Sequence, residues 1–494
     1  MELNPDWPEP ALSLTVTLMN PADDPHPEVL EAQARVCTGP HQSRPLGLKD
    51  GDPDPERVLT VILDSLRQTG SPVSNAQLGA FFAAMAIRRG FGAKTGWSAA
   101  ESAAMRARRG ALLEALPSAP RFLLDPETPP DLPAADAELA PWLGRILAGE
   151  HLSAAETRDL LDAVLRRPVD DALRAAVLIG QRMNIETLQE AEGYLDAVLA
   201  PDDLVEVDAP SLTHFGQPFD GAARYIRPTL WVAAVRAALG RPTVLHGVDE
   251  LPPKNGVTEE QVLRHLGAAT DLTRERAAGL LADPTIGLAY ISQREYAPEL
   301  YALRHLRRHI AKRPVWATTE KVQRLFRCSG RNCMVVGFYH KGYEEKMLHL
   351  MRRQGLDAGL AVKGEEGSSH YVLRLGKPSG VDRKAVNFTK GFRRGAEGDE
   401  EFEVDVEPRD FGLDYDHSPR PAGVDVERCA REGMAALAGE RGPLYDRIAL
   451  SVGVVDCCLG FEEDPVAAVE RARRELDDGG ALAHLRAYIE ATLG

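Results

Sequence analysis

Two arginines near the middle of the chain have the type and spacing of an anion site. Arg224 and Arg227 come just before Pro228 and Thr229, in the run GAARYIRPTL. Proline suits a first helical turn, so this run predicts a helix N-terminus, whose free backbone N–H groups attract anions. Guanidinium groups beside it favour a phosphate or a carboxylate. The alternative is that both arginines pair with nearby Asp or Glu side chains.

A second candidate is a basic segment inside an acidic protein. The 494-residue chain has a formal net charge of -16, whereas residues 290–363 contain 15 Arg or Lys against 6 Asp or Glu. Such an island indicates a nucleic-acid footprint, with contacts to phosphates that weaken as salt rises. Its densest part, RHLRRHIAKRP, contains Arg304, Arg307, Arg308 and Lys312. A solvated helix face is the alternative.

Composition excludes several classes of protein. The hydrophobic fraction of 44% and the charged fraction of 27% are those of a globular chain. No apolar run is long enough for a membrane span, and the first residues do not resemble a secretory signal. Six cysteines are too few for a disulfide scaffold, so we expect a cytoplasmic protein without membrane contact. Cysteine and histidine spacing matches no zinc motif.

The elements that must position these residues change along the chain. Helical periodicity covers 56–116 and 140–200, with a Pro-rich linker between them and a capping box at Ser153 and Glu156. Short apolar runs then alternate with helices and predict strands at 243–247, 286–292, 333–339, 359–364 and 370–375. This alternation indicates an α/β layer with a mostly parallel sheet, followed by C-terminal helices.

The two helical stretches also resemble each other. Residues 58–90 and 143–184 each read as a helix, a polar turn and an Ala-rich helix. One explanation is a duplicated helical unit. The other is that any two amphipathic pairs rich in Ala and Leu look alike.

Several longer phrases identify a family. They are LHG…PPKNGVTEEQVLRHLG, VVGFYHKGYEEKMLHLMRRQGLDAGLAVKGEEG and EPRDFGLDYD. With them, residues 140–494 resemble the anthranilate phosphoribosyltransferase family, of glycosyltransferase family 3 and the nucleoside phosphorylase type of fold. The run HFGQPFDGAARYIRPTLWVAAVRAALG resembles a divergent plant and cyanobacterial branch. The resemblance implies transfer of ribose phosphate from phosphoribosyl pyrophosphate to an aromatic amine, with Mg2+, in a homodimer joined through its helical domain.

The expected architecture therefore has three parts. Residues 1–130 form an N-terminal extension, an irregular arm plus helices. Residues 131–205 form a small helical domain that would make the homodimer. Residues 206–494 form the larger α/β domain, with a mostly parallel central sheet and C-terminal helices.

The donor-side motifs of the family are altered here. Its phosphate loop, GTGGD, corresponds to Gly216-Gln217-Pro218-Phe219-Asp220, followed by Gly221. Pro218 has no N–H and Phe219 adds bulk, so this loop would not hold a diphosphate in the family's way. Thr229 keeps a hydroxyl at the helix start. The KHGNR motif keeps only His246 and Gly247, and the Lys254-Asn255 turn either replaces the lost positive charge or is an ordinary turn.

The metal and acceptor motifs are altered too. The family's Asp-Glu pair for Mg2+ falls on Ser369 and His370. Glu365 and Glu366, just before them, are either a displaced metal pair or solvated turn charges. Arg307 and Arg308 match the family's paired arginines, one of which binds the anthranilate carboxylate, but TTEKV replaces the LGPLxNP segment. The acceptor is therefore expected not to be anthranilate.

We thus expect a glycosyltransferase of this family with altered motifs, which transfers (phospho)ribose to an unknown acceptor. The alternative is a non-catalytic homodimeric paralogue that binds nucleic acid through residues 290–363. The sequence identifies no catalytic residue. The residues expected to hold the phosphates or diphosphate of phosphoribosyl pyrophosphate or another phosphorylated small molecule are Gly216, Gln217, Asp220, Gly221, Arg224, Arg227, Thr229, His246, Gly247, Lys254 and Asn255.

Overall fold

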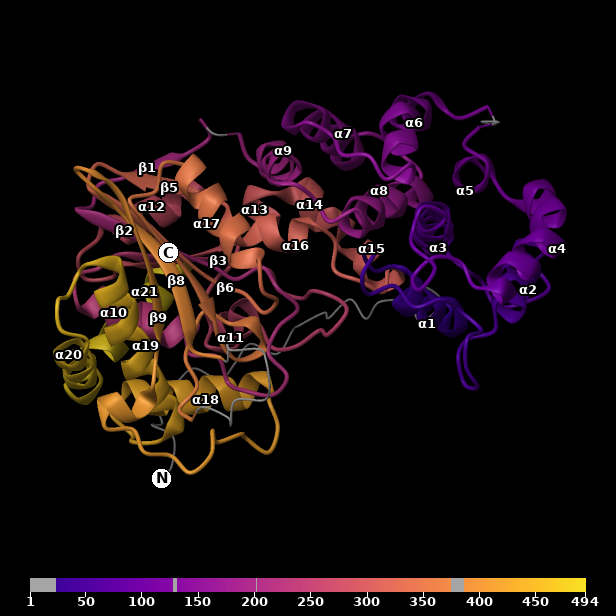
Figure 1. Cartoon of the computed structure of the whole chain (residues 1–494). Coiled ribbons are helices and arrows are strands. Elements are labelled where there is room, and N and C mark those ends of the chain that lie inside the picture. The colour runs from indigo at the N-terminus through magenta and orange to yellow at the C-terminus, as the bar shows by residue number, and fades with distance from the viewer. Residues whose placement is uncertain (1–23, 128–130, 201, 375–385) are drawn as a thin grey trace. The chain divides into compact units, whose positions relative to one another are not determined.

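The computed structural model describes residues 24–127, 131–200, 202–374 and 386–494, which form two compact units (Figure 1). One unit is helical and contains the described residues between 24 and 200 together with 299–319. The other is α/β and contains the rest. The division differs from the three parts expected, because the N-terminal helices share one unit with residues 131–200. The basic run at 304–312 belongs to that helical unit and not to the α/β unit.

The helical unit is built largely from capped helices. Ser153 accepts the N–H of Glu156 in the capping box that the sequence predicted, which sets the start of α7. The helices are α1 (Pro27–Val36), α2 (Pro55–Leu66), α3 (Asn75–Arg88), α4 (Ala99–Ala115), α5 (Ser118–Leu124), α6 (Ala134–Leu147), α7 (Ala154–Arg166), α8 (Asp171–Met183), α9 (Leu188–Val198), α14 (Pro298–Ala302), α15 (Leu306–His309) and α16 (Trp316–Thr319).

A seven-stranded sheet, ordered β4-β3-β2-β6-β7-β8-β9, is the centre of the α/β unit in the described residues. The first five strands are parallel and almost entirely buried, as expected for strands covered on both faces. The strands are β2 (Ser211–Gly216), β3 (Thr243–Gly247), β4 (Leu288–Ser292), β6 (Arg331–Gly337), β7 (Ala358–Lys363), β8 (Phe388–Gly395) and β9 (Gly398–Asp405), and β1 (Val205–Val207) pairs separately with β5 (Phe326–Cys328).

Helices pack directly on these strands (Figure 1). Helix α10 lies on β3, α19 and α17 on β7, and α21 and α12 on β4. The helices of this unit are α10 (Thr229–Ala238), α11 (Glu259–His265), α12 (Arg274–Ala282), α13 (Gln293–Tyr296), α17 (Tyr343–Arg353), α18 (Val426–Leu437), α19 (Pro443–Leu459), α20 (Pro465–Asp477) and α21 (Gly480–Leu493). No described helix is both long and apolar enough to cross a bilayer.

The strand predictions are confirmed for four of the five apolar runs and wrong for one. Residues 370–375 were expected to form a strand, but the described part of this run has no ladder partner. Instead, the Asn387 side chain accepts the N–H of Val372 and donates to its carbonyl. A side chain thus satisfies the backbone where a neighbouring strand was expected. Part of the segment that follows, like residues 1–23 of the expected irregular arm, lies outside the described residues.

Close packing of α3 against α8 forms the centre of the helical unit. These are the second, Ala-rich helices of the two similar stretches, and most residues of both are buried. A Cβ on Gly79 would lie 2.0 Å from the carbonyl oxygen of Ala172, so the two backbones touch where glycine has no side chain. Helix α8 therefore buries its apolar face against a helix of the same chain.

The contact between α3 and α8 predicts that a Gly→Ala substitution has different effects on stability at two helical glycines. Gly79→Ala should destabilise the protein by on the order of 1–3 kcal/mol, because backbone must move to admit the methyl group. Gly110→Ala is the matched control: nothing lies within 4 Å of its added Cβ, so it should be neutral or stabilise by up to about 1 kcal/mol. Urea unfolding followed by circular dichroism compares them, and equal shifts would contradict the packing.

Candidate functional site

The carboxyl edge of the parallel strands gathers the polar residues of the α/β unit. The chain enters the sheet at β2, adds β3 and β4 on one side, and then adds β6 and β7 on the other. Ligands of such sheets bind outside the carboxyl ends of the strands, where the order reverses. Here that point lies between β2 and β6, beside Gln217. The loop 364–370, which follows β7, reaches it through a 3.4 Å hydrogen bond from Gln217 Nε2 to Ser369 Oγ.

Two glycines let neighbouring backbone approach at this edge. A Cβ on Gly216 would lie 1.7 Å from the carbonyl oxygen of Lys321, and one on Gly337 would lie 2.1 Å from that of Gly367. The connections after β2 and β6 are therefore covered closely by other segments of the same unit.

Arg227 is the central cation of the loop that follows β2. Its guanidinium lies 3.6 Å from the ring centroid of Phe219 and pairs with Glu259 at 3.5 Å, and its Nη2 donates to the side-chain oxygen of Gln217. Burial lowers its pKa, against the opposing effect of Glu259. Phe219, which the sequence marked as bulk in a phosphate loop, thus supplies an aromatic face for a cation.

Glu366 is held by backbone N–H groups of the same loop. Its carboxylate accepts hydrogen bonds from Ala223 at 3.4 Å, Arg224 at 3.0 Å and Tyr225 at 3.3 Å. Lys254 Nζ donates to it at 3.0 Å. Burial alone would raise the pKa of Glu366, but these hydrogen bonds outweigh it and hold the pKa below its ordinary value. Three successive amides and a lysine thus form a cradle for an oxyanion, which this chain fills with its own carboxylate.

Glu365 has the opposite electrostatic environment. Burial raises its pKa, although Arg224, Arg420 and Arg447 act against this rise. It lines a cavity of about 20 Å³ with ten lining residues, the others being Tyr225, Ile226, Arg227, Pro228, Glu366, Ser368, His370, Tyr371 and Arg447. Adjacent carboxylates are therefore tuned in opposite directions, one toward the charged form and one toward the neutral form.

His370 is a neutral, buried group at the same edge. Its Nε2 is 2.8 Å from the hydroxyl of Thr229 and 3.2 Å from that of Ser369, and its ring stacks on Phe215. Burial, reinforced by Arg227 and Arg447, keeps its pKa well below the ordinary value. Thr229 is the first residue of α10, which confirms the helix start predicted there.

Five other predicted site residues have structural contacts of their own. His246 is buried, with its Nδ1 3.4 Å from the hydroxyl of Tyr296, and burial lowers its pKa to about 3. A Cβ on Gly247 would lie 2.9 Å from the Tyr290 hydroxyl oxygen. Asp220 and Gly221 shape the loop through its pairing with Gly256, whose N–H donates to the Asp220 carbonyl at 2.8 Å. Asn255 takes a left-handed turn conformation, with φ +49°.

The basic run lies in the helical unit and is largely engaged there. Arg307 is buried with its guanidinium 5.9 Å from the Trp316 ring centroid. Arg308 donates to Asp24 at 2.8 Å. Arg304 stacks on Tyr301 at 3.9 Å. The pKa of Lys312 is lowered by burial and by nearby Arg182. These cations do not form one free, solvated face.

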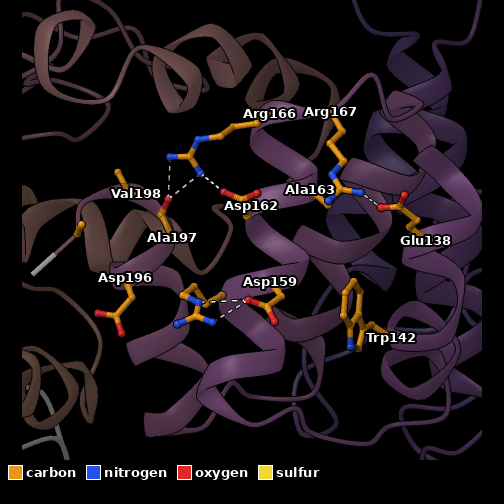
Figure 2. Close-up of a pocket in the computed structure, with 12 residues that line it drawn as sticks. Glu138, Trp142, Asp159, Asp162, Ala163, Arg166, Arg167, Asp196, Ala197 and Val198 are labelled. Carbon is orange, nitrogen blue, oxygen red and sulfur yellow. Dashed lines mark hydrogen bonds and ion pairs between the residues drawn. The ribbon is translucent and has the colours of Figure 1, made fainter. Parts of the chain in front are cut away.

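A cavity of about 500 Å³ lies in the helical unit (Figure 2). Its walls come from α6, α7 and α9 and the residues just after α9, and they carry charged side chains that pair with one another. Arg158 binds Asp159 at 2.9 Å, and Arg166 and Arg167 pair with Asp162 and Glu138. It contains no residue of the predicted site. Within the described residues, no group of three or more His, Cys, Asp or Glu side chains is arranged to hold a metal ion.

Several residues of the cluster were not foreseen from the sequence. Glu259 follows a helix-capping threonine, and Arg420 and Arg447 lie in the C-terminal region, far along the chain from the loop they approach. Arg420 Nε donates to the Tyr225 hydroxyl at 2.6 Å. Their charge alone did not mark them, because their role depends on the fold that brings Arg420 and Arg447 beside this loop.

The comparisons with known proteins agree with this architecture, although no family model matches the chain. Anthranilate phosphoribosyltransferase of Xanthomonas campestris is 26% identical over 352 residues, which cover 71% of this chain and 96% of the relative. An uncharacterised protein of Aquifex aeolicus is 26% identical over 334 residues, covering 66% and 94%.

Solved structures show the same fold. Anthranilate phosphoribosyltransferase of Thermus thermophilus aligns with a TM-score of 0.57 and 20% identity, over 71% of this chain and 99% of its own. The Saccharomyces cerevisiae enzyme, solved in complex with PRPP and Mg, aligns with a TM-score of 0.57 and 16% identity, over 72% and 98%. Over most of its length this protein is thus similar in sequence to anthranilate phosphoribosyltransferases, and it shares their fold.

Proposed function

We propose that this protein is a phosphoribosyltransferase-type glycosyltransferase that binds a phosphorylated ribose donor at the carboxyl edge of its sheet. The observation that carries the proposal is the convergence of three backbone N–H groups and Lys254 on one carboxylate, at the point where the strand order reverses. Donors arranged in this way suit the oxygens of a phosphate as well as those of a carboxylate. The proposal is further supported by the yeast relative, which was solved with PRPP and Mg.

In such a transferase the protein acts mainly by electrostatics. The bond between the ribose C1 and the diphosphate breaks, the electron pair leaves with the diphosphate, and positive charge develops on the ribosyl centre. The acceptor's nucleophilic atom then bonds to C1 and releases its proton to solvent. Preorganised cations and amides stabilise the departing oxyanion. Arg224, Arg227 and Lys254 are the proposed donor-side contacts, since all three lie around the Glu366 cradle or the loop before α10.

The acceptor is proposed to be a compound other than anthranilate. Arg307, which matches one of the family's paired arginines, is buried against Trp316. The segment that replaces the family's LGPLxNP forms the end of α16 and a short 3-10 turn, Glu320–Val322. Its Thr318, Thr319 and Glu320 are buried, so this segment differs from the family in chemistry and is already packed.

Two further features remain proposals. We expect a cytoplasmic protein, in keeping with six free thiols. The homodimer expected through 140–200 would need a face other than that of α8, because α8 is buried against α3.

The nucleic-acid alternative receives less support than the transferase. Its footprint needs several accessible cations in one groove. Arg307 is buried, and Arg308 already binds Asp24.

Donor binding is the first test. The wild-type protein should bind phosphoribosyl pyrophosphate in isothermal titration calorimetry, and Lys254→Ala should weaken binding about tenfold, the loss of one charged hydrogen bond. Lys390→Ala is the matched control, because Lys390 on β8 pairs with Glu345 on α17 and not with the site. This variant should bind phosphoribosyl pyrophosphate as the wild type does. Equal affinity in both variants would contradict the proposed site.

Acceptor choice is the second test. Expression at native level in a tryptophan auxotroph that lacks anthranilate phosphoribosyltransferase should give no growth, because the phosphate loop and the acceptor segment both differ from the family's. Expression of a functional family enzyme from the same vector provides the positive control. Growth on medium without tryptophan would show that anthranilate is accepted after all.

A further inference from the structure

The carboxylates near the site do not fit the Mg2+ that the family implies. Mg2+ needs nearly octahedral oxygen ligands with free lone pairs. Glu366 already accepts three backbone N–H groups and the Lys254 ammonium. The positions of the family's Asp-Glu pair carry Ser369 and His370, whose side chains bond to each other, and His370 also bonds to the Thr229 hydroxyl. Of the expected displaced metal pair, Glu366 is thus committed to three amides and a lysine, and burial of Glu365 raises its pKa and so disfavours the charged form that Mg2+ needs.

The charge around these carboxylates is already positive without a metal. Five cationic side chains face this edge: Arg224, Arg227, Lys254, Arg420 and Arg447. The carboxylates that face them are Asp220, Glu259, Glu365 and Glu366. A divalent cation would add to an excess of positive charge, whereas a polyanion would neutralise it.

Two of these arginines are buried and have hydrogen-bond donors without an acceptor. Arg227 and Arg447 both line the cavity of about 20 Å³, and the Nε of each has no hydrogen-bond partner. The other contacts of Arg447 are long, 3.4 Å to the Ile226 carbonyl and 3.5 Å to the Pro419 carbonyl. A buried donor without a partner is costly, and phosphate oxygens are the acceptors that guanidinium groups match best.

We propose that this protein binds the diphosphate of its donor without a divalent metal, with Arg227 and Arg447 supplying the charge that Mg2+ supplies elsewhere. The inference rests on the proposed donor site. The cavity has room for about one water molecule, so the ligand must take the place of the Glu365 carboxylate beside Arg447. The exchange replaces one carboxylate by a more highly charged anion among the same cations.

The experiment titrates inorganic pyrophosphate into the full chain by calorimetry, once with excess EDTA and once with excess MgCl2. Affinity in the two conditions should agree within about threefold. In EDTA, the affinity of Arg447→Ala for pyrophosphate should be lower than that of the wild type by about tenfold or more, because the substitution removes a charged group that donates to the anion. Arg441→Ala is the matched control, because the Arg441 side chain is exposed and pairs with Asp477. This variant should bind pyrophosphate with the affinity of the wild type.

The outcomes separate the two proposals. Binding that requires MgCl2 overturns metal independence and leaves the donor site intact. Absence of pyrophosphate binding in both conditions overturns the donor site itself, and metal independence with it. Metal-free binding that is equal in Arg447→Ala and wild type overturns the role of Arg447. If circular dichroism shows that Arg447→Ala is unfolded, Arg447→Lys replaces it, and an unchanged affinity in that variant overturns the role of the guanidinium fork.

Discussion

One carboxylate joins two separate segments of the α/β unit. Glu366 comes from the loop after β7, and the three N–H groups that it accepts belong to the segment leading into α10. Its side chain is only 7% exposed, so the carboxylate itself is largely removed from water and depends on these amides for hydrogen bonds. Glu366 also adopts φ +54°, an uncommon backbone conformation that the surrounding contacts must stabilise. The positions of Arg224, Arg227 and the first turn of α10 all depend on this contact.

The architecture was predictable where local pattern and final structure agree. The apolar runs at 243–247 and 359–364 became buried parallel strands, and Pro228-Thr229 marked the start of α10. The hairpin of β8 and β9 was missed because β9, GDEEFEVD, is an acidic strand at the edge of the sheet. Edge strands often carry charges that prevent further pairing, and such a sequence lacks the apolar alternation of a typical strand.

The sequence singled out individual residues of the candidate site, but not which of them pair with one another. Arg224, Arg227 and Lys254 stood out through their charge and their place in the family's motifs, yet the Glu366 to Lys254 pair spans 112 residues. His246 kept its place in the motif, but its side chain packs against Tyr296. A count of charge along the chain also overestimated how many cations of the basic run are available to a ligand. Arg308, for example, is paired with Asp24, nearly three hundred residues earlier.

The stacking of Arg227 on Phe219 has a consequence for how such a loop evolves. The guanidinium lies 3.6 Å from the ring centroid, and Lys254 shares the same ring at 5.7 Å. Restoring the family's glycine at this position would leave two cations without their aromatic face, while Pro218 would still withhold an N–H. Restoring the neighbouring glycine first would leave the bulk of the ring in place. Replacement of Phe219 alone would therefore remove an aromatic contact from both cations without supplying the missing N–H, so positions 218 and 219 must change together to recover the family's loop.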